Sequence, residues 1–365
     1  MRLSLHIWVL VIVCLIALGY AVSRKNKVSK KRCVFLITVV LTLFSGLRSW
    51  KMGDVYHYYY AFLQCNSESW HLDFTSHDSV GTQILYRIIG QLHLDFGVCL
   101  FLIAAFSAIS LGVFVYRYST SPYLSYLIYI GLGSYIFTLS GLKQTIAMAF
   151  VMWAMMAVIE SKPKRFLVFT ALGALFHLPA CIFLVAYFAA HKKIDGLYFA
   201  GLVAIAVLVM VFRDQIVEQM AALYYEDELK FNASEGIGGK FIILLAILVF
   251  SIVIHPLTDN NKTYRYLFNI IVLAAILQSF SAYDNVFTRL ADYYFQFFCI
   301  FVPLVLNSRT EYVSDGTQCC GYRIPRTLRM MGVAAITVLA AIIYVQTLNA
   351  STDLLSEFSF LWENR

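Results

Sequence analysis

Apolar runs of about 17–22 residues recur along almost the whole chain, and this recurrence limits the fold more than any other feature. A run of this length matches a transmembrane helix, because about 20 apolar residues span the core of a bilayer, whereas a transmembrane strand needs only ~10 alternating residues. The chain is 60% hydrophobic and 13% charged, whereas soluble domains carry roughly 25% charged residues. The sequence therefore predicts an all-α, polytopic integral membrane protein.

The domain organisation follows from the same pattern. We expect residues 1–365 to form a single transmembrane domain of about 11–12 helical segments, including one broken hairpin of short helices and no soluble domain. The longest polar stretch, residues 51–95, is predicted to be an external loop. Its helical apolar spacing from Ile84 to Leu92 indicates an interfacial amphipathic helix. Residues 213–239 are predicted to form a second external loop.

Basic loops set the expected orientation of the spans. Residues 23–32, SRKNKVSKKR, carry six positive charges and no acid, so this loop is predicted to be cytoplasmic and the N-terminus external. The SKPKR segment at 161–165 is placed in the cytoplasm on the same ground. Outside the stretch 166–190, we predict spans at residues 3–20, 33–50, 97–116, 122–139, 141–159, 197–212, 240–256, 264–282, 290–306 and 330–348.

The apolar stretch 166–190 decides on which side every later loop lies. As one span, it would place two later basic loops outside and the acidic loop 213–239 inside, against the positive-inside rule, and would move Arg289 away from the outer face. A hairpin of two short helices that breaks at His177, Leu178 and Pro179 removes these conflicts. Proline suits the first turn of a new helix, and each arm of ~12 residues covers only about 18 Å. We therefore expect His177 at the tip of a half-depth hairpin that opens toward an outer cavity.

Ionisable residues inside or beside the apolar spans mark the candidate site. A charge at membrane depth costs roughly 2.5–3.5 kcal/mol, so such residues usually face a protein interior or a wet cavity. With the hairpin in place, unusual polar residues are predicted to converge on the outer face: Arg48, Asp54, Lys143, Gln144, His177, Asp284, Arg289 and Asp292. Arg289, Tyr293 and Gln296 recur at i, i+4 and i+7 and share one helix face. Two positive groups and a histidine from distant parts of the chain predict one polar cavity that receives an anion.

Each of these residues also has an ordinary structural interpretation. Lys143 and Arg289 can be snorkelling interface anchors. His177 can be a core histidine with satisfied hydrogen bonds, and Asp54 can simply pair with Arg48. The tyrosine cluster that follows can be an interfacial aromatic belt. The joint pattern, rather than any one residue, favours a functional site.

Four short motifs, in this order, resemble the landmarks of the EpsG family, whose members are similar to the polymerases of O-antigen-type polysaccharides. They are GDVYHYYY after a span ending near Arg48, then GLKQTIA, ALFHLPA and FTRLADYYF, and the resemblance covers about residues 45–305. The family usually has arginine before the glutamine of the second of these motifs, whereas this chain has Lys143. The acidic residue often found in the external amphipathic segment is not evident in SVGTQILYRI. A lysine keeps the charge but loses bidentate phosphate geometry.

The resemblance implies an enzyme that joins oligosaccharide repeat units carried on undecaprenyl diphosphate, at the outer face of a bacterial cytoplasmic membrane. Besides this substrate and membrane lipid, a chain-length regulator and a flippase of the same pathway are implied partners. Within that reaction, Lys143 and Arg289 would neutralise the departing diphosphate, and Asp54 or His177 would deprotonate the attacking hydroxyl. Substrate contacts are expected from Arg48, Gln144, Tyr58, Tyr293 and Asp292. A metal-independent mechanism is the simpler expectation, since no metal-ligand spacing is present.

Other function classes are weighed by the same features. A flippase or another transporter of lipid-linked oligosaccharides also needs a charged cavity, but the sequence shows no pair of similar halves. A polytopic glycosyltransferase that uses lipid-phosphate sugars places an acid early in an external loop, which Asp54 and Asp78 could mimic. A membrane acyltransferase would need an arginine motif beside His6. The net charge of +7 does not indicate nucleic-acid binding, because the basic residues cluster in short loops beside spans.

Overall fold

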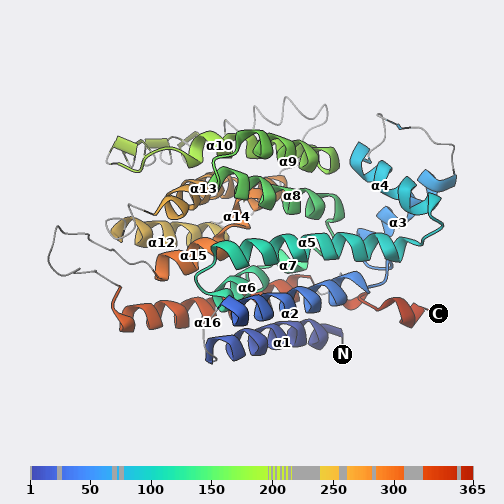
Figure 1. The fold of residues 1–365 in the computed structure, drawn as a ribbon, viewed down its shortest axis with the longest axis horizontal. Coiled ribbons are helices and arrows are strands. Elements are labelled where there is room, and N and C mark those ends of the chain that lie inside the picture. The colour runs from blue at the N-terminus through green and yellow to red at the C-terminus, as the bar shows by residue number, and fades with distance from the viewer. Residues whose placement is uncertain are drawn as a thin grey trace.

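The computed structural model describes residues 2–22, 27–67, 72–73, 78–195, part of 197–215, 239–254, 261–281, 285–307, 324–351 and 355–364. Helices stacked roughly parallel to one another make up the body of the molecule, and both chain termini lie toward the end that carries α3 and α4 (Figure 1). Within the described residues the only extended pairing is an isolated antiparallel bridge between Arg48 and Phe360. The predicted all-α membrane fold is confirmed.

The helices follow the apolar runs of the sequence. Their bounds are α1 (Arg2–Val22), α2 (Lys27–Gly46), α3 (Val55–Ser67), α4 (Val80–Gln91), α5 (Phe96–Tyr118), α6 (Pro122–Gly131), α7 (Ser134–Phe137), α8 (Leu142–Ile159), α9 (Pro163–Phe176), the 3-10 helix η1 (Leu178–Phe183), α10 (Leu184–Ala190), α12 (Gly239–Val253), α13 (Lys262–Gln278), α14 (Asn285–Phe295), α15 (Phe298–Leu306), α16 (Arg326–Ala350) and the 3-10 helix η3 (Leu361–Asn364).

Several helix starts have a chemical cause that the sequence displays. The side chain of Asp95 caps α5 by accepting from the backbone N–H of Val98, and Asn261 caps α13 in the same way. Proline occupies the first turn of α6 and of α9, where its missing N–H costs nothing. Such caps fix the residue at which each membrane helix begins. They thereby also fix the positions, along the helix axis, of the side chains near that end.

Three described helices are long and apolar enough to cross a membrane, namely α5, α8 and α16. A fourth candidate is the pair α14–α15, which bends by 46° at its break. The predicted spans 122–139 and 290–306 are therefore not continuous helices. The first divides into α6 and α7 at Gly133, whose φ of 85° is a conformation that glycine adopts readily. The predicted spans 3–20, 33–50, 240–256 and 264–282 correspond to α1, α2, α12 and α13.

The stretch 166–190 is a hairpin, as the loop charges predict. Helix α9 ends at Phe176, and His177 then takes an extended backbone with φ −152° and ψ 101° before Pro179 begins the return in η1. The returning arm starts with a 3-10 helix and continues as α10, a change of geometry that the sequence pattern does not predict. Helix α9 packs closely along α8, and a Cβ added to Gly173 would lie 3.2 Å from the backbone oxygen of Ala147.

The two ends of the molecule differ in the chain segments that they bring together. At one end, which we call the basic end, Lys30 donates to the carbonyl of Ser119 at 2.7 Å and Lys262 donates to Ser161 Oγ at 2.8 Å. These segments are the loops predicted to be cytoplasmic. The other end, which we call the site end, carries α3, α4, the start of α8 and the hairpin tip (Figure 1).

The C-terminal segment belongs to the site end. The carboxylate of Glu357 accepts from the backbone N–H of Gly53 at 2.9 Å, just before α3. The tail therefore lies at the same end of the molecule as the start of the 51–95 segment. In that segment the predicted amphipathic helix is α4, and α3 is an additional helix. Asp284, almost all of 213–239 and much of the predicted span 197–212 lie outside the described residues.

Candidate active site at the site end

Lys143 stands in the first turn of α8 and forms an ion pair with an acid from the external segment. Its Nζ lies 3.0 Å from Asp78 Oδ1, and the same ammonium lies over the ring of Tyr58 at 5.6 Å from the centroid. Both partners of the ion pair are largely buried, with side chains 21% and 16% exposed. The sequence analysis considered Asp78 only as the acid of a rival glycosyltransferase and did not predict its ion pair with Lys143.

His177 joins the hairpin tip to α14. Its Nδ1 lies 2.7 Å from the hydroxyl of Tyr293, whose side chain is fully buried. Arg289 lies one turn before Tyr293 on α14, and its backbone carbonyl is 2.7 Å from the side-chain amide of Gln144, the residue after Lys143. The three ionisable residues that the sequence singled out are therefore brought together, although they come from three separate parts of the chain.

Gln144 holds α14 beside α8. Its Nε2 donates at 2.7 Å to the backbone carbonyl of Arg289. Gln144 itself is buried, whereas the Arg289 side chain is exposed. The helix face predicted from i, i+4 and i+7 spacing thus runs from an exposed guanidinium at Arg289 to the buried side chains of Tyr293 and Gln296.

Tyr58 lies between the charged groups of the external segment and those of the helices. Burial, together with the negative charge of Asp54, raises the pKa of Tyr58 to about 12, whereas the charge of Arg289 acts in the opposite direction. The phenol is therefore neutral at physiological pH and can donate a hydrogen bond. Asp54 is exposed at the start of α3, where its backbone carbonyl accepts from the N–H of Tyr58.

Asp292 is engaged by a second ion pair next to the first group. Its Oδ1 lies 3.2 Å from Nζ of Lys240, which opens α12 and also sits over the ring of Phe295 at 5.1 Å. Lys240 was not predicted as a site residue. The signal that could have found it is its place at the site-end terminus of an apolar helix, the position that also distinguishes Lys143.

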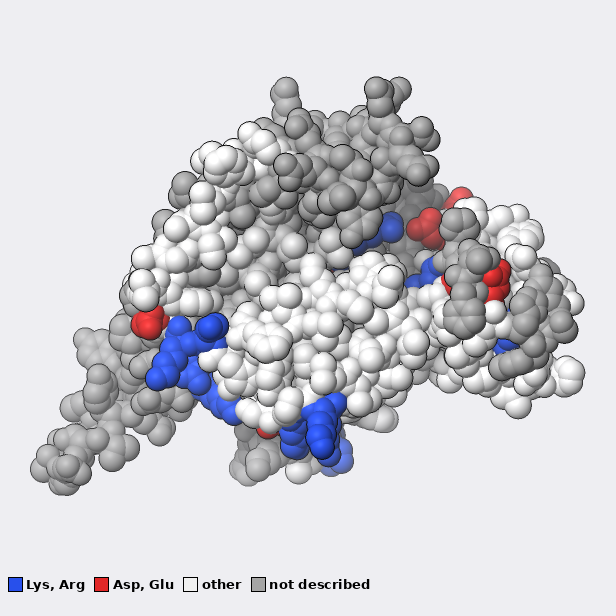
Figure 2. Space-filling view, turned by 90° about the horizontal axis from the view of Figure 1, so that it is seen from above, with Lys and Arg blue, Asp and Glu red and all other residues white. Residues whose placement is uncertain are grey.

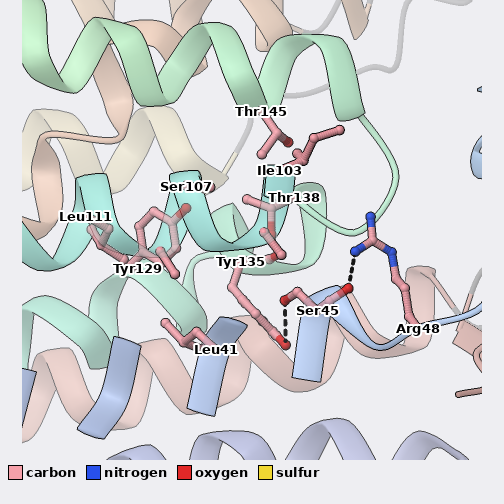
Figure 3. Close-up of a pocket in the computed structure, with 12 residues that line it drawn as sticks. Leu41, Ser45, Arg48, Ile103, Ser107, Leu111, Tyr129, Tyr135, Thr138 and Thr145 are labelled. Carbon is pink, nitrogen blue, oxygen red and sulfur yellow. Dashed lines mark hydrogen bonds between the residues drawn. The ribbon is translucent and has the colours of Figure 1, made fainter. Parts of the chain in front are cut away.

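Arg48 does not face this group of residues, although it was expected among them. Its side chain is 1% exposed, and it lines a cavity of about 20 Å³ between α2, α5, α6, α7 and α8 that includes no other predicted site residue (Figure 3). Nη1 donates to the carbonyl of Ser45, whereas Nε and Nη2 find no hydrogen-bond partner among the described residues. The C-terminal segment explains the burial, because Ser359 and Leu361 form backbone hydrogen bonds across residues 47–49.

Taken together, the site end presents cations, carboxylates and phenols at the ends of helices that are otherwise apolar. On the face seen in Figure 2, acidic and basic side chains lie close together at this end, whereas basic side chains predominate in the charged groups elsewhere. Lys143 and Arg289 offer positive charge to an anion, and His177 offers a titratable nitrogen. The arrangement is suited to hold an anionic group near a proton acceptor, which is the requirement for displacing a phosphate leaving group.

Comparison with known proteins assigns the chain to a family. The EpsG family matches residues 31–349, nearly the whole chain, and this range holds every landmark described above. Searches of curated proteins and of solved structures found no match. The family is one of Wzy-like polymerases, so the match supports a polysaccharide polymerase-like role in a multi-pass membrane protein. On this match, the chain belongs to the EpsG family.

Proposed function

We propose that the protein polymerises oligosaccharide repeat units that are carried on undecaprenyl diphosphate, with its site end at the outer face of a bacterial cytoplasmic membrane. The observation that carries the proposal is the convergence of Lys143, His177 and Arg289 at one end of an apolar helix bundle. A lipid-linked diphosphate needs positive charge at the membrane surface and apolar helices below it. This end supplies both.

The reaction is a glycosyl transfer with diphosphate as the leaving group. The hydroxyl oxygen of the acceptor sugar bonds to the anomeric carbon of the donor, and the bond from that carbon to the diphosphate oxygen breaks. The electron pair leaves with the diphosphate, and the hydroxyl proton goes to a base. Lys143 and Arg289 would neutralise the negative charge that develops on the leaving group, as cationic clamps do in phosphoryl transfer.

His177 is the base that the geometry favours, because its hydrogen bond to Tyr293 fixes the orientation of the ring. When Nδ1 carries the proton and donates to the phenol oxygen, the lone pair of Nε2 is available to accept the hydroxyl proton. Asp54 is the second candidate, since its carboxylate is exposed beside Tyr58. Lys143 already pairs with Asp78, whose carboxylate would compete with the diphosphate for the lysine ammonium.

Tyr58 is proposed to contact the sugars, because phenols both stack on sugar rings and donate hydrogen bonds. Tyr293 was also expected to bind substrate, but it is fully buried and bonded to His177, which supports a role in orienting that ring. Gln144 is proposed to act through the backbone of Arg289. Asp292 and Arg48 were expected to bind substrate directly. Their contacts with Lys240 and Ser45 instead support roles in positioning the helices.

The test is reconstitution of the purified protein in liposomes with a defined undecaprenyl-diphosphate repeat unit, followed by gel analysis of glycan length. Arg289→Ala is expected to lower polymer formation by about 100-fold or more, because a lost transition-state charge contact typically costs that much. Arg165→Ala is the matched control, since this arginine is exposed at the basic end. Equal loss in both variants, or no longer glycans from any repeat unit, would contradict the proposal.

Cells that carry Arg289→Ala separate the polymerase from a flippase. A polymerase defect leaves single repeat units at the outer leaflet, whereas a flippase defect removes them from that leaflet. Surface labelling of the glycans distinguishes these results. Loss of the single units from the outer leaflet would favour the transporter instead.

A further inference from the structure

The broken hairpin carries an apolar groove on its surface. The groove has a volume of about 410 Å³ and is lined by α9 on one side and by η1 and the start of α10 on the other. Small side chains form its hollow part and leucines form its borders: Ala171, Ala174, Leu167, Leu175, Leu178 and Leu184.

One end of the groove lies at the hairpin tip, next in the chain to His177. Leu175 and Leu178 line it, and they lie on either side of His177, whose ring bonds to Tyr293 at 2.7 Å. Away from the tip, the groove continues along α9 to Leu167, in the direction of the basic end. Leu167 and Leu178 are 54% and 73% exposed, so the groove is open along its side to whatever surrounds the bundle.

Cations at the hairpin tip together with an apolar groove favour an amphiphilic ligand. The cations at the tip suit a diphosphate, and the groove that leads away from them is lined almost wholly by apolar side chains. Inside a bilayer, an apolar groove gains little from the hydrophobic effect, because lipid tails are as apolar as leucine, and packing decides instead. The groove therefore sets the direction and depth of a chain whose head group is held by charge.

We propose that this groove holds the isoprenoid chain of the lipid-linked substrate, with the diphosphate beside Lys143 and Arg289. The inference rests on the proposed function and locates its lipid part. The chain would enter sideways from the outer half of the bilayer. Its position would place the bond between sugar and diphosphate next to His177.

A natural cysteine allows a direct test. Cys181 lines the groove and is exposed, whereas Cys65 in α3 is a half-buried cysteine outside it. The protein in lipid nanodiscs is reacted with N-ethylmaleimide, and each site is quantified by mass spectrometry. Undecaprenyl diphosphate at about ten times its Kd is expected to slow labelling of Cys181 roughly tenfold, because about one site in ten stays empty. Labelling of Cys65 is expected not to change.

Two further probes identify what protects the thiol. Inorganic diphosphate carries the head-group charge without a chain, and it is expected to leave the labelling of Cys181 unchanged. Added phosphatidylglycerol carries a chain and a single phosphate, and it is also expected to give no protection. The proposal is wrong if undecaprenyl diphosphate fails to protect Cys181, or if either probe protects it equally.

Filling the groove gives a second, independent measurement. Ala174→Trp is expected to raise KM about tenfold for a repeat unit on undecaprenyl diphosphate and to leave KM unchanged for one on a short prenyl diphosphate, because only the long chain needs the groove. Ala335→Trp on the exposed face of α16 is the matched control for insertion and folding. An equal rise in KM for both substrates would overturn the proposal.

The result also separates this inference from the function on which it rests. Protection of Cys181 without any polymer formation would support the groove as a lipid site and contradict the polymerase. Polymer formation without protection of Cys181 would support the polymerase and remove the groove from its substrate site.

Discussion

Replacing Asp78 by asparagine tests whether the ion pair with Lys143 tunes anion binding. The two charged atoms lie 3.0 Å apart. The Coulomb energy of such a pair is ~1.4 kcal/mol in bulk water and ~5.5 kcal/mol at an effective dielectric constant of 20. The side chains are 21% and 16% exposed, so the pair lies between these limits before the cost of desolvation is subtracted. We therefore expect a net coupling of ~1–2 kcal/mol.

A diphosphate that binds Lys143 must compete with Asp78 for the same ammonium. Asp78→Asn is therefore expected to tighten diphosphate binding by about 10-fold, which corresponds to ~1.4 kcal/mol. Lys143→Ala is expected to weaken binding more than a simple loss of one charge would, because it leaves the Asp78 carboxylate facing the anion. The double variant Lys143→Ala/Asp78→Asn removes both charges and is expected to recover about 10-fold relative to Lys143→Ala.

Displacement of a fluorescent undecaprenyl diphosphate analogue from the purified protein measures these affinities. The expected order, from tightest to weakest, is Asp78→Asn, wild type, the double variant and Lys143→Ala. Raising the salt concentration is expected to compress the differences, since partly exposed charges are screened. If the double variant binds no better than Lys143→Ala, the carboxylate does not face the ligand and the reasoning fails.

Three further substitutions test how the site is positioned. Tyr293→Phe removes the hydrogen bond to His177. It is expected to lower kcat by about fivefold to tenfold without lowering Tm. An unchanged kcat would show that the bond does not orient the His177 ring. In Gly81→Val the new Cβ would lie 2.9 Å from a backbone oxygen of α9, so thermal unfolding should show a loss of ~1–3 kcal/mol in stability. Gly19→Val, whose new Cβ would meet nothing within 4 Å, should show no such loss. Gln144→Leu removes the donor to a carbonyl of α14, and we expect diphosphate binding to weaken by about 10-fold in the displacement assay; wild-type affinity would exclude this positioning role.

The hairpin shows what the sequence alone can establish about this fold. Loop charges predicted its existence, and Pro179 marked where the second arm begins. The 3-10 geometry of that arm could not be predicted, because it depends on how the arm packs against α14 and not on any local preference. The break at Gly133 had a local signal in glycine, but an apolar run by itself does not distinguish one span from two short helices.

The site residues divide in the same way. Lys143, His177 and Arg289 were predicted together because each carries a conspicuous cost at membrane depth, and the structure brings them together. Asp78 was missed as a partner because its ion pair joins positions 65 residues apart, which no local pattern records. Arg48 was expected to face the site, but the sequence does not determine which way a side chain at the end of a span turns. Its burial depends on the C-terminal segment that pairs with residues 47–49.

The lysine at position 143 stands where the family pattern has arginine, and its surroundings limit the positions that its ammonium can take. Arginine presents a rigid fork to a phosphate, whereas a lysine ammonium is a point charge on a flexible stem. Here the carboxylate of Asp78 at 3.0 Å and the ring of Tyr58 at 5.6 Å hold that stem from two sides. Both residues come from the external segment rather than from α8. The conformation of the external segment therefore determines where the Lys143 ammonium lies. The fold of α3 and α4 is in this way connected directly to anion binding at the site.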